Sequence, residues 1–295
     1  MSYHSRISKA FEHALCLPLY LDSRYVLFSD CHRGCGTTND NYLKNEFLWL
    51  AAVKHYDHQG FTYLELGDGD ELWENRSIEK IKESHLQTFQ LLSRLYQERH
   101  FYAICGNHDM IKKYPAYRRK HLSTYFCEQD LCDHPLFPDI TFYSGIILKD
   151  IQNQKDIYLT HGHQSDILNS TLWRVSRFLV RFVWTPLEKL GIPDPTSAAK
   201  NNSRKKESEK RLASWAKEYG HILIAGHTHH PMTGSCDSPY FNTGSCVHPS
   251  GITAIEIEHR CITLVKWSIR TRPDMTLYAS REILGETLCI DECLT

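Results

Sequence analysis

The stretch Phe101–Asp109 reads FYAICGNHD and joins an apolar run to three polar side chains that can bind a metal or move a proton. The run Phe101–Cys105 is short, apolar and rich in β-favouring residues, which predicts a buried strand. Asn107, His108 and Asp109 follow it, so they would stand at the carboxyl end of that strand. Open α/β sheets bind their ligands at this edge. The stretch therefore predicts a parallel sheet with a chemical site at its carboxyl edge.

Two earlier segments repeat this order of an apolar strand followed by a polar turn. Arg24–Ser29 (RYVLFS) and Phe61–Leu66 (FTYLEL) each lead into an aspartate. Apolar residues at helical spacing over Tyr42–His55 and Ile78–Gln97 separate the three strands. Strand, loop and helix that alternate in this way predict an α/β fold with a parallel sheet covered by helices.

The second half of the chain places histidine-rich turns after strands. Ile157–Thr160 (IYLT) is followed by H-G-H, and Ile222–Ala225 (ILIA) is followed by G-H-T-H. Three further strand-like segments have no long helices between them, so we expect antiparallel pairs that finish a second sheet. These segments are Tyr240–Thr243, Gly251–Glu258 and Cys261–Ile269.

We expect one domain over residues 1–295, with a helical cap inserted at 164–218. Leu172–Leu190 is apolar and aromatic, and it carries a stripe of arginines at helical spacing. The stripe consists of Arg174, Arg177 and Arg181. Such a cap can bind phosphates or amphiphiles, or touch a membrane surface peripherally. The alternative is that its apolar side packs on the core and the arginines are solvated.

Composition limits the classes of partner and compartment. The 34 basic residues nearly balance the 35 acidic ones, so no global field favours nucleic acid or an anionic membrane. The sequence lacks an apolar stretch of about 18 residues, the length of a transmembrane helix. We expect a cytoplasmic protein whose 11 cysteines are mostly free thiols, with a disulfide-rich secreted protein as the alternative.

The polar turns contain side chains that suit metal binding. Asp30 and His32 are two residues apart, and on an extended strand they would point the same way and reach one metal. The carboxylate of Asp68 has two oxygens and can bridge two cations. Asn107 and His161 offer further donors, as do His227 and His229. Imidazole and carboxylate together suit Mn, Fe, Zn or Co better than Ca or Mg.

Two other assignments compete for this region. The segment Cys31–Cys35 (CHRGC) contains zinc-type ligands, but Cys31 would face away from His32 and no second CxxC or HxxxH partner is obvious. Asp70 is an alternative ligand to Asp68, or a hydrogen-bond acceptor behind the metals. The spacings favour the multi-turn site, because the 38 positions from Asp30 to Asp68 suit one βαβ unit of about 30 or more residues.

The series D-x-H, G-D, G-N-H-D, H-G-H and G-H-x-H resembles that of the calcineurin-like metallophosphoesterase superfamily. The resemblance implies a four-layer α/β/β/α sandwich of two mixed sheets. It also implies two divalent transition metal ions, with Mn expected first and Fe, Zn or Co as alternatives. One metal would be held by Asp30, His32, Asp68 and His229. The other would be held by Asp68, Asn107, His161 and His227.

The resemblance also implies a phosphohydrolase in which a hydroxide bridging the two metals attacks phosphorus. His108 would be the catalytic imidazole, and Asp109 could orient it through its other ring nitrogen. Arg33 and His163 are candidates for substrate contact. For Arg33 the alternative is a solvated loop residue, and for His163 it is support of the turn.

The G-N-H-D motif and the cap are similar to the branch that includes UDP-2,3-diacylglucosamine pyrophosphohydrolase. That branch usually has arginine where His108 stands. This departure argues against the lipid A reaction itself. The near-neutral charge and the apolar cap favour a phosphohydrolase of small-molecule or lipid- or nucleotide-headgroup substrates. A protein phosphatase and a non-catalytic scaffold of the same fold are the alternatives. A nuclease is disfavoured, because the sequence shows no basic stripe with interleaved aromatics outside the cap.

Overall fold

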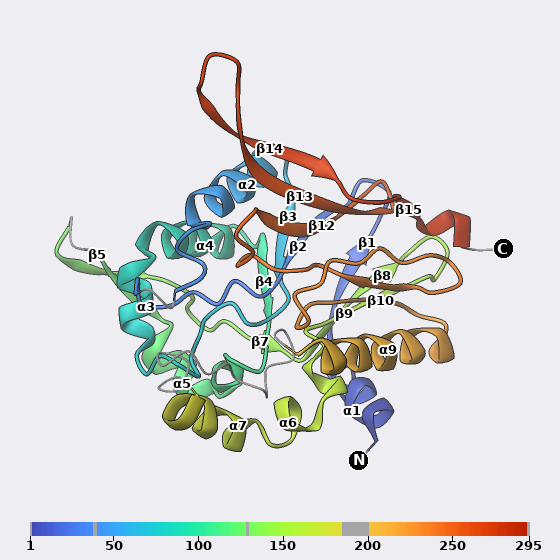
Figure 1. Cartoon of the computed structure of the whole chain (residues 1–295), viewed down its shortest axis with the longest axis horizontal. Helices are drawn as coiled ribbons and strands as arrows, with labels where there is room; N and C mark the ends of the chain where they lie inside the picture. The colour runs from blue at the N-terminus through green and yellow to red at the C-terminus, as the bar shows by residue number, and fades with distance from the viewer. Residues whose placement is uncertain (1, 38–39, 128–129, 185–200, 294–295) are drawn as a thin grey trace.

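The computed structural model describes residues 2–37, 40–127, 130–184 and 201–293, and its centre is a pair of β-sheets (Figure 1). The larger sheet has the order β14-β13-β12-β2-β3-β4-β7, with β15 beside β13. The strands β2, β3, β4 and β7 run parallel, and β12 to β15 are antiparallel additions. Their bounds are β2 Arg24–Phe28, β3 Thr62–Glu65, β4 Phe101–Ile104, β7 Phe142–Tyr143, β12 Ile252–Glu258, β13 Cys261–Thr271, β14 Leu277–Ile283 and β15 Leu288–Cys289.

The smaller sheet has five strands in the order β1-β8-β9-β10-β11. It is mixed, because β8 and β9 pair antiparallel and the other neighbours pair in parallel. Its strands are β1 Leu15–Leu19, β8 Gly145–Asp150, β9 Ile157–Thr160, β10 Ile222–Ala225 and β11 Tyr240–Asn242. A separate two-stranded hairpin consists of β5 Thr124–Cys127 and β6 Cys132–Pro135.

The alternation of side chains along the strands explains the layers. In β2, Val26 and Phe28 join one core cluster, while Tyr25 and Leu27 join another. The first cluster lies against helices α2 and α4, and the second fills the space between the two sheets. Alternate residues of a strand point to opposite faces, so this sheet is buried on both sides.

Helices cover the outer face of each sheet. The helices α2 Glu46–His58 and α4 Leu86–Gln97 pack on the larger sheet, and α1 Tyr3–Lys9 and α9 Asn202–Tyr219 pack on the smaller one. The expected four-layer α/β/β/α sandwich is therefore confirmed. The remaining helical segments are α3 Ile78–Ser84, η1 Met110–Lys113, α5 Pro115–His121, η2 His163–Ser165, α6 Ile167–Ser170, α7 Trp173–Leu179, the π-helix η3 Val180–Trp184 and η4 Ile290–Cys293.

The prediction of one helix over Ile78–Gln97 is wrong, because the chain forms two helices that meet at His85. The backbone of His85 has φ −122° and ψ 39°, which are not helical angles. Its buried imidazole lies 2.8 Å from an Asp40 oxygen and 3.1 Å from a Glu46 oxygen. The helix is therefore broken at a residue whose side chain contacts two acidic residues from an earlier part of the chain. The periodicity of apolar residues does not reveal such contacts.

The prediction that the C-terminal strands finish a second sheet is also wrong in part. The pair β12 and β13 is antiparallel as expected, but β12 pairs with β2 and so extends the larger sheet. Only β11 joins the smaller sheet, and it lies parallel to β10. The sequence patterns located these strands correctly but did not specify their neighbours.

Four of the cysteines form disulfides, namely Cys236–Cys293 and Cys261–Cys289. The remaining seven are free, so most of the thiols are unpaired, as expected. The general expectation of free thiols does not hold for the C-terminal cysteines Cys289 and Cys293. No helix in the described part of the chain is long and apolar enough to span a membrane.

The segment predicted as a cap contains two different kinds of helix. The helix α9 belongs to the outer layer of the smaller sheet, where Leu212 and Trp215 pack against Leu223. The helices α6 and α7 lie at the edge of the sandwich (Figure 1), and residues of α7 and η3 line a hollow together with Ile111 of η1. Residues 185–200, which include part of the predicted apolar stretch, lie outside the described residues.

Candidate metal centre

The carboxyl ends of β2, β3, β9 and β10 bring the candidate ligands from both sheets together. Asp30, His32 and His229 form one group whose donor atoms lie within 4.8 Å of one another. A second such group combines one aspartate with two histidines, and it consists of Asp68, His161 and His227. Asn107 follows β4, and the N–H of its neighbour His108 donates to Asp68 Oδ1 at 2.8 Å.

Five of these side chains stand on backbone that L-residues rarely adopt. The φ angle is positive, between 48° and 68°, at Asp30, His32, Asp68, His227 and His229. Left-handed backbone at a non-glycine residue is destabilising by about 1–2 kcal/mol. It persists where the surrounding structure enforces it, and it clusters at functional sites.

Close approach of the loops requires glycine at Gly67. Its φ is +89°, and a Cβ there would lie 2.6 Å from the backbone nitrogen of Gly106. The backbones of the G-D and G-N-H-D turns therefore approach each other closely at Gly67 and Gly106. This contact places Asp68 directly beside the turn that carries Asn107 and His108.

Four of the ligand atoms that face the centre are buried and have no hydrogen-bond partner in the described structure. Buried atoms of this kind are Asp30 Oδ1, Asn107 Oδ1, His161 Nε2 and His227 Nε2. Buried polar atoms without a partner are costly, so a group of them converging on one place fits a cation. The residues present therefore fit divalent metal ions.

Hydrogen bonds behind the centre fix which atom of each ligand faces inward. Asp30 Oδ2 accepts from Ser29 Oγ and from the His227 N–H, which leaves Oδ1 toward the centre. His161 Nδ1 lies 2.8 Å from the Leu66 carbonyl, so this nitrogen donates and Nε2 is left as the lone-pair donor. Partners of this kind orient metal-binding imidazoles in proteins generally.

Asp68 lies between the two groups. Its Oδ2 is 3.2 Å from His161 Nε2 and 3.8 Å from His32 Nε2. Burial alone would raise the pKa of Asp68, but the imidazoles of His161 and His108 lower it well below its usual range. An ionised carboxylate in this position can contact one cation in each group.

Comparison with known proteins identifies the family of this arrangement. A sequence profile described as calcineurin-like phosphoesterase matches residues 23–231. The chain belongs to this family. It is a metal-dependent phosphoester hydrolase, and the family usually binds divalent metals. No curated protein matches the phosphoesterase in sequence.

Several solved structures are similar to the phosphoesterase in fold at low sequence identity. A mutant cold-active protein tyrosine phosphatase has a TM-score of 0.41 and 14% identity, covering 92% of this chain and 82% of the other. Vps29 of Chaetomium thermophilum has a TM-score of 0.38 and 10% identity, covering 89% and 97%. A 5'-nucleotidase from Candida albicans has a TM-score of 0.31 and 11% identity, covering 90% and 51%.

Glu71 is a central residue that sequence reasoning missed. Its carboxylate lies 2.8 Å from His32 Nδ1 and 2.7 Å from His108 Nδ1, so it accepts a hydrogen bond from both imidazoles. Burial alone would lower the pKa of His108, but the charges of Glu71 and Asp68 raise it. With Nδ1 bonded to Glu71, Nε2 is the nitrogen of His108 that remains to face a substrate.

The prediction that Asp109 orients His108 is wrong. Asp109 Oδ1 accepts from the Gly106 N–H at 2.8 Å, and Oδ2 accepts from Gly69 N–H at 3.2 Å and from Lys112 Nζ at 2.9 Å. Asp109 thus ties together the two turns that carry Asp68 and Asn107. The carboxylate that contacts Nδ1 of His108 belongs to Glu71 and not, as predicted from the sequence, to Asp109.

The prediction that Arg33 contacts substrate is also wrong, because only 1% of its side chain is exposed. Its guanidinium binds both Glu65 oxygens at 2.8 and 2.9 Å and Asp70 Oδ1 at 2.6 Å. Asp70 in turn binds Lys112 Nζ at 2.6 Å. Asp70 is therefore an acceptor in a buried charge network behind the metal centre.

His163 lies near the centre, with its ring centroid 5.4 Å from that of His161 and 6.5 Å from that of His227. It is 5% exposed, and Nδ1 has no hydrogen-bond partner among the described residues. Burial, together with His161 and His227, holds the pKa of His163 well below its usual value, which favours a neutral ring. Contact between His163 and substrate stays a prediction.

Trp73 links the imidazole of His108 to α7 and η3. Its ring stacks on His108 with centroids 4.3 Å apart, and it clusters with Met110, Trp173 and Val180. Arg181 of η3 donates to the backbone carbonyls of Leu72, Trp73 and Asn75. The cap helices thus hold the loop that supports His108.

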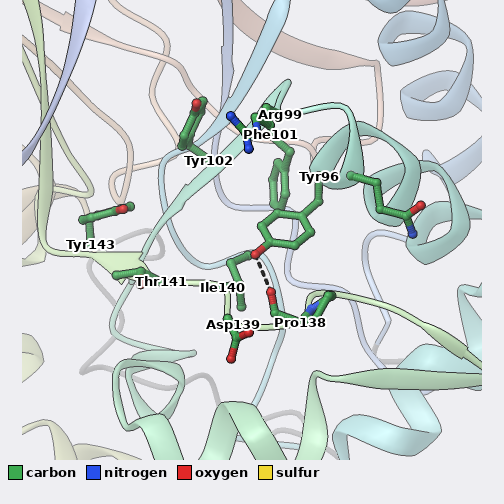
Figure 2. Close-up of a pocket in the computed structure, with 10 residues that line it drawn as sticks. Tyr96, Arg99, Phe101, Tyr102, Pro138, Asp139, Ile140, Thr141 and Tyr143 are labelled. Atoms are coloured by element: carbon green, nitrogen blue, oxygen red, sulfur yellow. Dashed lines mark hydrogen bonds between the residues drawn. The ribbon is translucent and has the colours of Figure 1, made fainter.

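A hollow of about 470 Å³ lies at the opposite end of β4 from this centre. Figure 2 shows that Phe101, Tyr96, Tyr102 and Tyr143 contribute to its walls, and that the Tyr96 hydroxyl donates to the Pro138 carbonyl. Phe101 begins β4, whereas the catalytic turn follows the end of that strand. This hollow is therefore separate from the metal centre.

Proposed function

We propose that the phosphoesterase is a dinuclear phosphohydrolase of small-molecule phosphate esters or anhydrides that carry an apolar group, as lipid and nucleotide headgroup compounds do. One metal would bind Asp30, His32, Asp68 and His229. The other would bind Asp68, Asn107, His161 and His227. The observation that carries the proposal is the convergence of partnerless buried donor atoms on either side of Asp68.

The chemistry divides between the metals and the protein. Two divalent ions, which we expect to be Mn with Fe, Zn or Co as alternatives, would lower the pKa of a water and polarise the phosphoryl oxygens. His108 is placed to give a proton to the leaving oxygen through Nε2. Glu71 stabilises the protonated form of His108 and fixes its orientation.

The cap offers apolar and cationic groups beside the metal centre. A hollow of about 350 Å³ between η1 and α7 is lined in part by Tyr114, Trp173, Arg177 and Phe178. The side chains of Phe178 and Phe182 are 58% and 50% exposed, which is more than a helix that only packs on a core requires. Guanidinium groups beside exposed rings suit a substrate with a phosphate and an apolar tail.

An assay panel tests the substrate class. We would compare bis-p-nitrophenyl phosphate, p-nitrophenyl phosphate, a nucleotide-sugar, an acylated phosphoester and a phosphopeptide, each with added Mn²⁺. We expect the acylated phosphoester or the nucleotide-sugar to have the highest kcat/KM. A clear preference for the phosphopeptide would replace the proposal with a protein phosphatase, and activity on no substrate with no bound metal would indicate a scaffold.

The role of the cap is tested by Phe178→Ala and Phe182→Ala. Burying a phenylalanine is worth about 1.5–3 kcal/mol, so each variant should raise KM for the acylated substrate by about 10- to 100-fold. KM for p-nitrophenyl phosphate should stay unchanged. Phe126→Ala is the matched control, because Phe126 of β5 is also 50% exposed. Equal losses on both substrates would contradict a binding role for the cap.

A further inference from the structure

The hairpin of β5 and β6 stands apart from the two main sheets, as Figure 1 shows on the left of the molecule. Its base is attached to the helical layer, where Lys82 Nζ donates to the Thr124 carbonyl and Ser93 Oγ to the Pro135 carbonyl. An isolated two-stranded hairpin is marginally stable in water. The other end of this hairpin therefore needs a further source of stability.

Four side chains with metal-binding chemistry gather at that end. Donor atoms of Cys127, Asp130 and His134 all lie within 4.8 Å of one another. His134 Nε2 is 2.9 Å from Asp130 Oδ2 and 3.4 Å from Cys132 Sγ. Cys132 lies outside the group of three and joins it through His134, so the cluster offers two thiols, one imidazole and one carboxylate.

The strand register explains why these side chains meet. Cys127 is paired directly with Cys132 across the hairpin, so both point to the same face. His134 is two residues beyond Cys132 and shares that face. The ring of Tyr125 stacks on His134 with centroids 5.6 Å apart and fixes the direction of the imidazole.

The separation of Cys132 Sγ and His134 Nε2 fits one edge of a tetrahedral zinc site. Zinc binds thiolate sulfur at about 2.3 Å and imidazole nitrogen at about 2.0 Å, which places S and N about 3.5 Å apart in a tetrahedron. The observed separation of Cys132 Sγ and His134 Nε2 is 3.4 Å. The four residues between Cys127 and Cys132 also match the C-x2–4-C spacing of structural zinc sites.

We propose that Cys127, Asp130, Cys132 and His134 bind one structural zinc ion that closes the hairpin. Four protein ligands complete a tetrahedron and leave no open position, as in structural rather than catalytic zinc sites. Thiolates select zinc over the hard cation Mn²⁺, so this site and the catalytic centre differ in metal preference. Binding displaces one proton from each cysteine thiol to solvent. The proposal does not depend on the substrate of the enzyme.

The full-length reduced protein tests the site through thiolate-bound zinc. After purification with zinc and removal of loose metal, a mercurial reagent is added and the zinc released is measured with a colorimetric chelator. The reagent frees zinc held by thiolates, and the catalytic ligands include no thiol. We expect about one equivalent per chain from the wild type, and a thiolate-to-metal charge-transfer band after replacement of zinc by Co²⁺.

The variants Cys132→Ser and His134→Gln should each lose this equivalent and the cobalt band, while they keep phosphoesterase activity. Cys16→Ser is the matched control, because Cys16 is also an exposed free cysteine, and it should keep both signals. Absence of mercurial-released zinc from the wild type would overturn the proposal. So would an unchanged amount in Cys132→Ser, or a Cys127–Cys132 disulfide in protein purified without reductant but with zinc.

Discussion

Replacement of Glu71 by glutamine tests the most specific feature of the catalytic site. Glu71 accepts hydrogen bonds from Nδ1 of His32, a candidate metal ligand, and of His108, the candidate proton donor. A glutamine side chain has nearly the same size but only one oxygen and no charge. Glu71 Oε2 faces both imidazoles, whereas Oε1 also accepts from the N–H groups of Trp73 and Glu74. A glutamine therefore turns its NH2 group toward one of these two sets of donors and loses acceptor contacts there.

The expected loss follows from these contacts. A hydrogen bond to a charged group contributes about 1.5–3 kcal/mol, and about 1.36 kcal/mol corresponds to a tenfold change in rate. Loss of one such bond predicts a fall in kcat/KM of roughly 10- to 100-fold, the range typical of residues that orient metal ligands. We would measure hydrolysis of bis-p-nitrophenyl phosphate over a range of Mn²⁺ concentrations, which separates kcat from metal affinity.

The chain offers a matched control in Glu79→Gln. Glu79 also pairs with Nδ1 of a histidine, His121, but its side chain is 46% exposed and stands on α3. This variant should keep wild-type activity and metal affinity. If Glu71→Gln behaved like Glu79→Gln, the hydrogen bonds to His32 and His108 would have no part in catalysis and the assignment of Glu71 would be refuted.

Three further predictions concern metal binding and stability. Asp68→Asn should lose metal from both groups, and its activity should fall by more than the roughly 100-fold typical of residues that only orient metal ligands. Metal analysis and the same assay measure both effects. Retained metal and turnover would refute the bridging role of Asp68. Asp109→Asn should raise the Mn²⁺ concentration needed for half-maximal rate, because it loosens the Gly69 and Gly106 contacts; unchanged metal dependence would contradict this. Burial would raise the pKa of Asp150, but Arg260 lowers it from 3.8 to about 2, so its stabilisation is present above about pH 4 and is lost as the pH falls through about 2. At about 1.36 kcal/mol per pKa unit this amounts to about 2 kcal/mol. The free energy of unfolding, measured with urea, should therefore change less between about pH 4 and pH 2 in Asp150→Asn than in the wild type. The same pH dependence in both proteins would contradict this prediction.

Short apolar strands were predicted well from the sequence. The bounds of Ile157–Thr160 and Ile222–Ala225 agree with β9 and β10 to the residue. Each is a short apolar run that ends at a histidine or a glycine, so the sequence changes abruptly from apolar residues to turn residues and marks the end of the strand. The break at His85 was not predictable in this way, because its partners Asp40 and Glu46 lie about 40 residues earlier.

The grouping of Asp30 with His32 was predicted for a reason that the structure does not support. The sequence argument placed both on an extended strand, where residues two apart point the same way. Both instead have left-handed backbone beyond the end of β2, with φ 52° and 48°. Alternation along a strand is a property of regular structure, whereas these residues are held by hydrogen bonds to the Gly67 and Asp68 carbonyls of the next turn.

Arg33 shows why local motifs cannot identify every residue behind a site. It stands beside His32 in a glycine-rich turn, which suggests an exposed phosphate ligand, yet its partners Glu65 and Asp70 lie 32 and 37 positions away. An unpaired buried guanidinium would be strongly destabilising, and so would an unpaired buried carboxylate. Once folding brings these charges together, they cross-link the turns after β2 and β3 and keep Arg33 from the solvent. This cross-link joins Arg33, next to His32, to Asp70, two residues after Asp68, so buried charges support the turns that carry the candidate metal ligands.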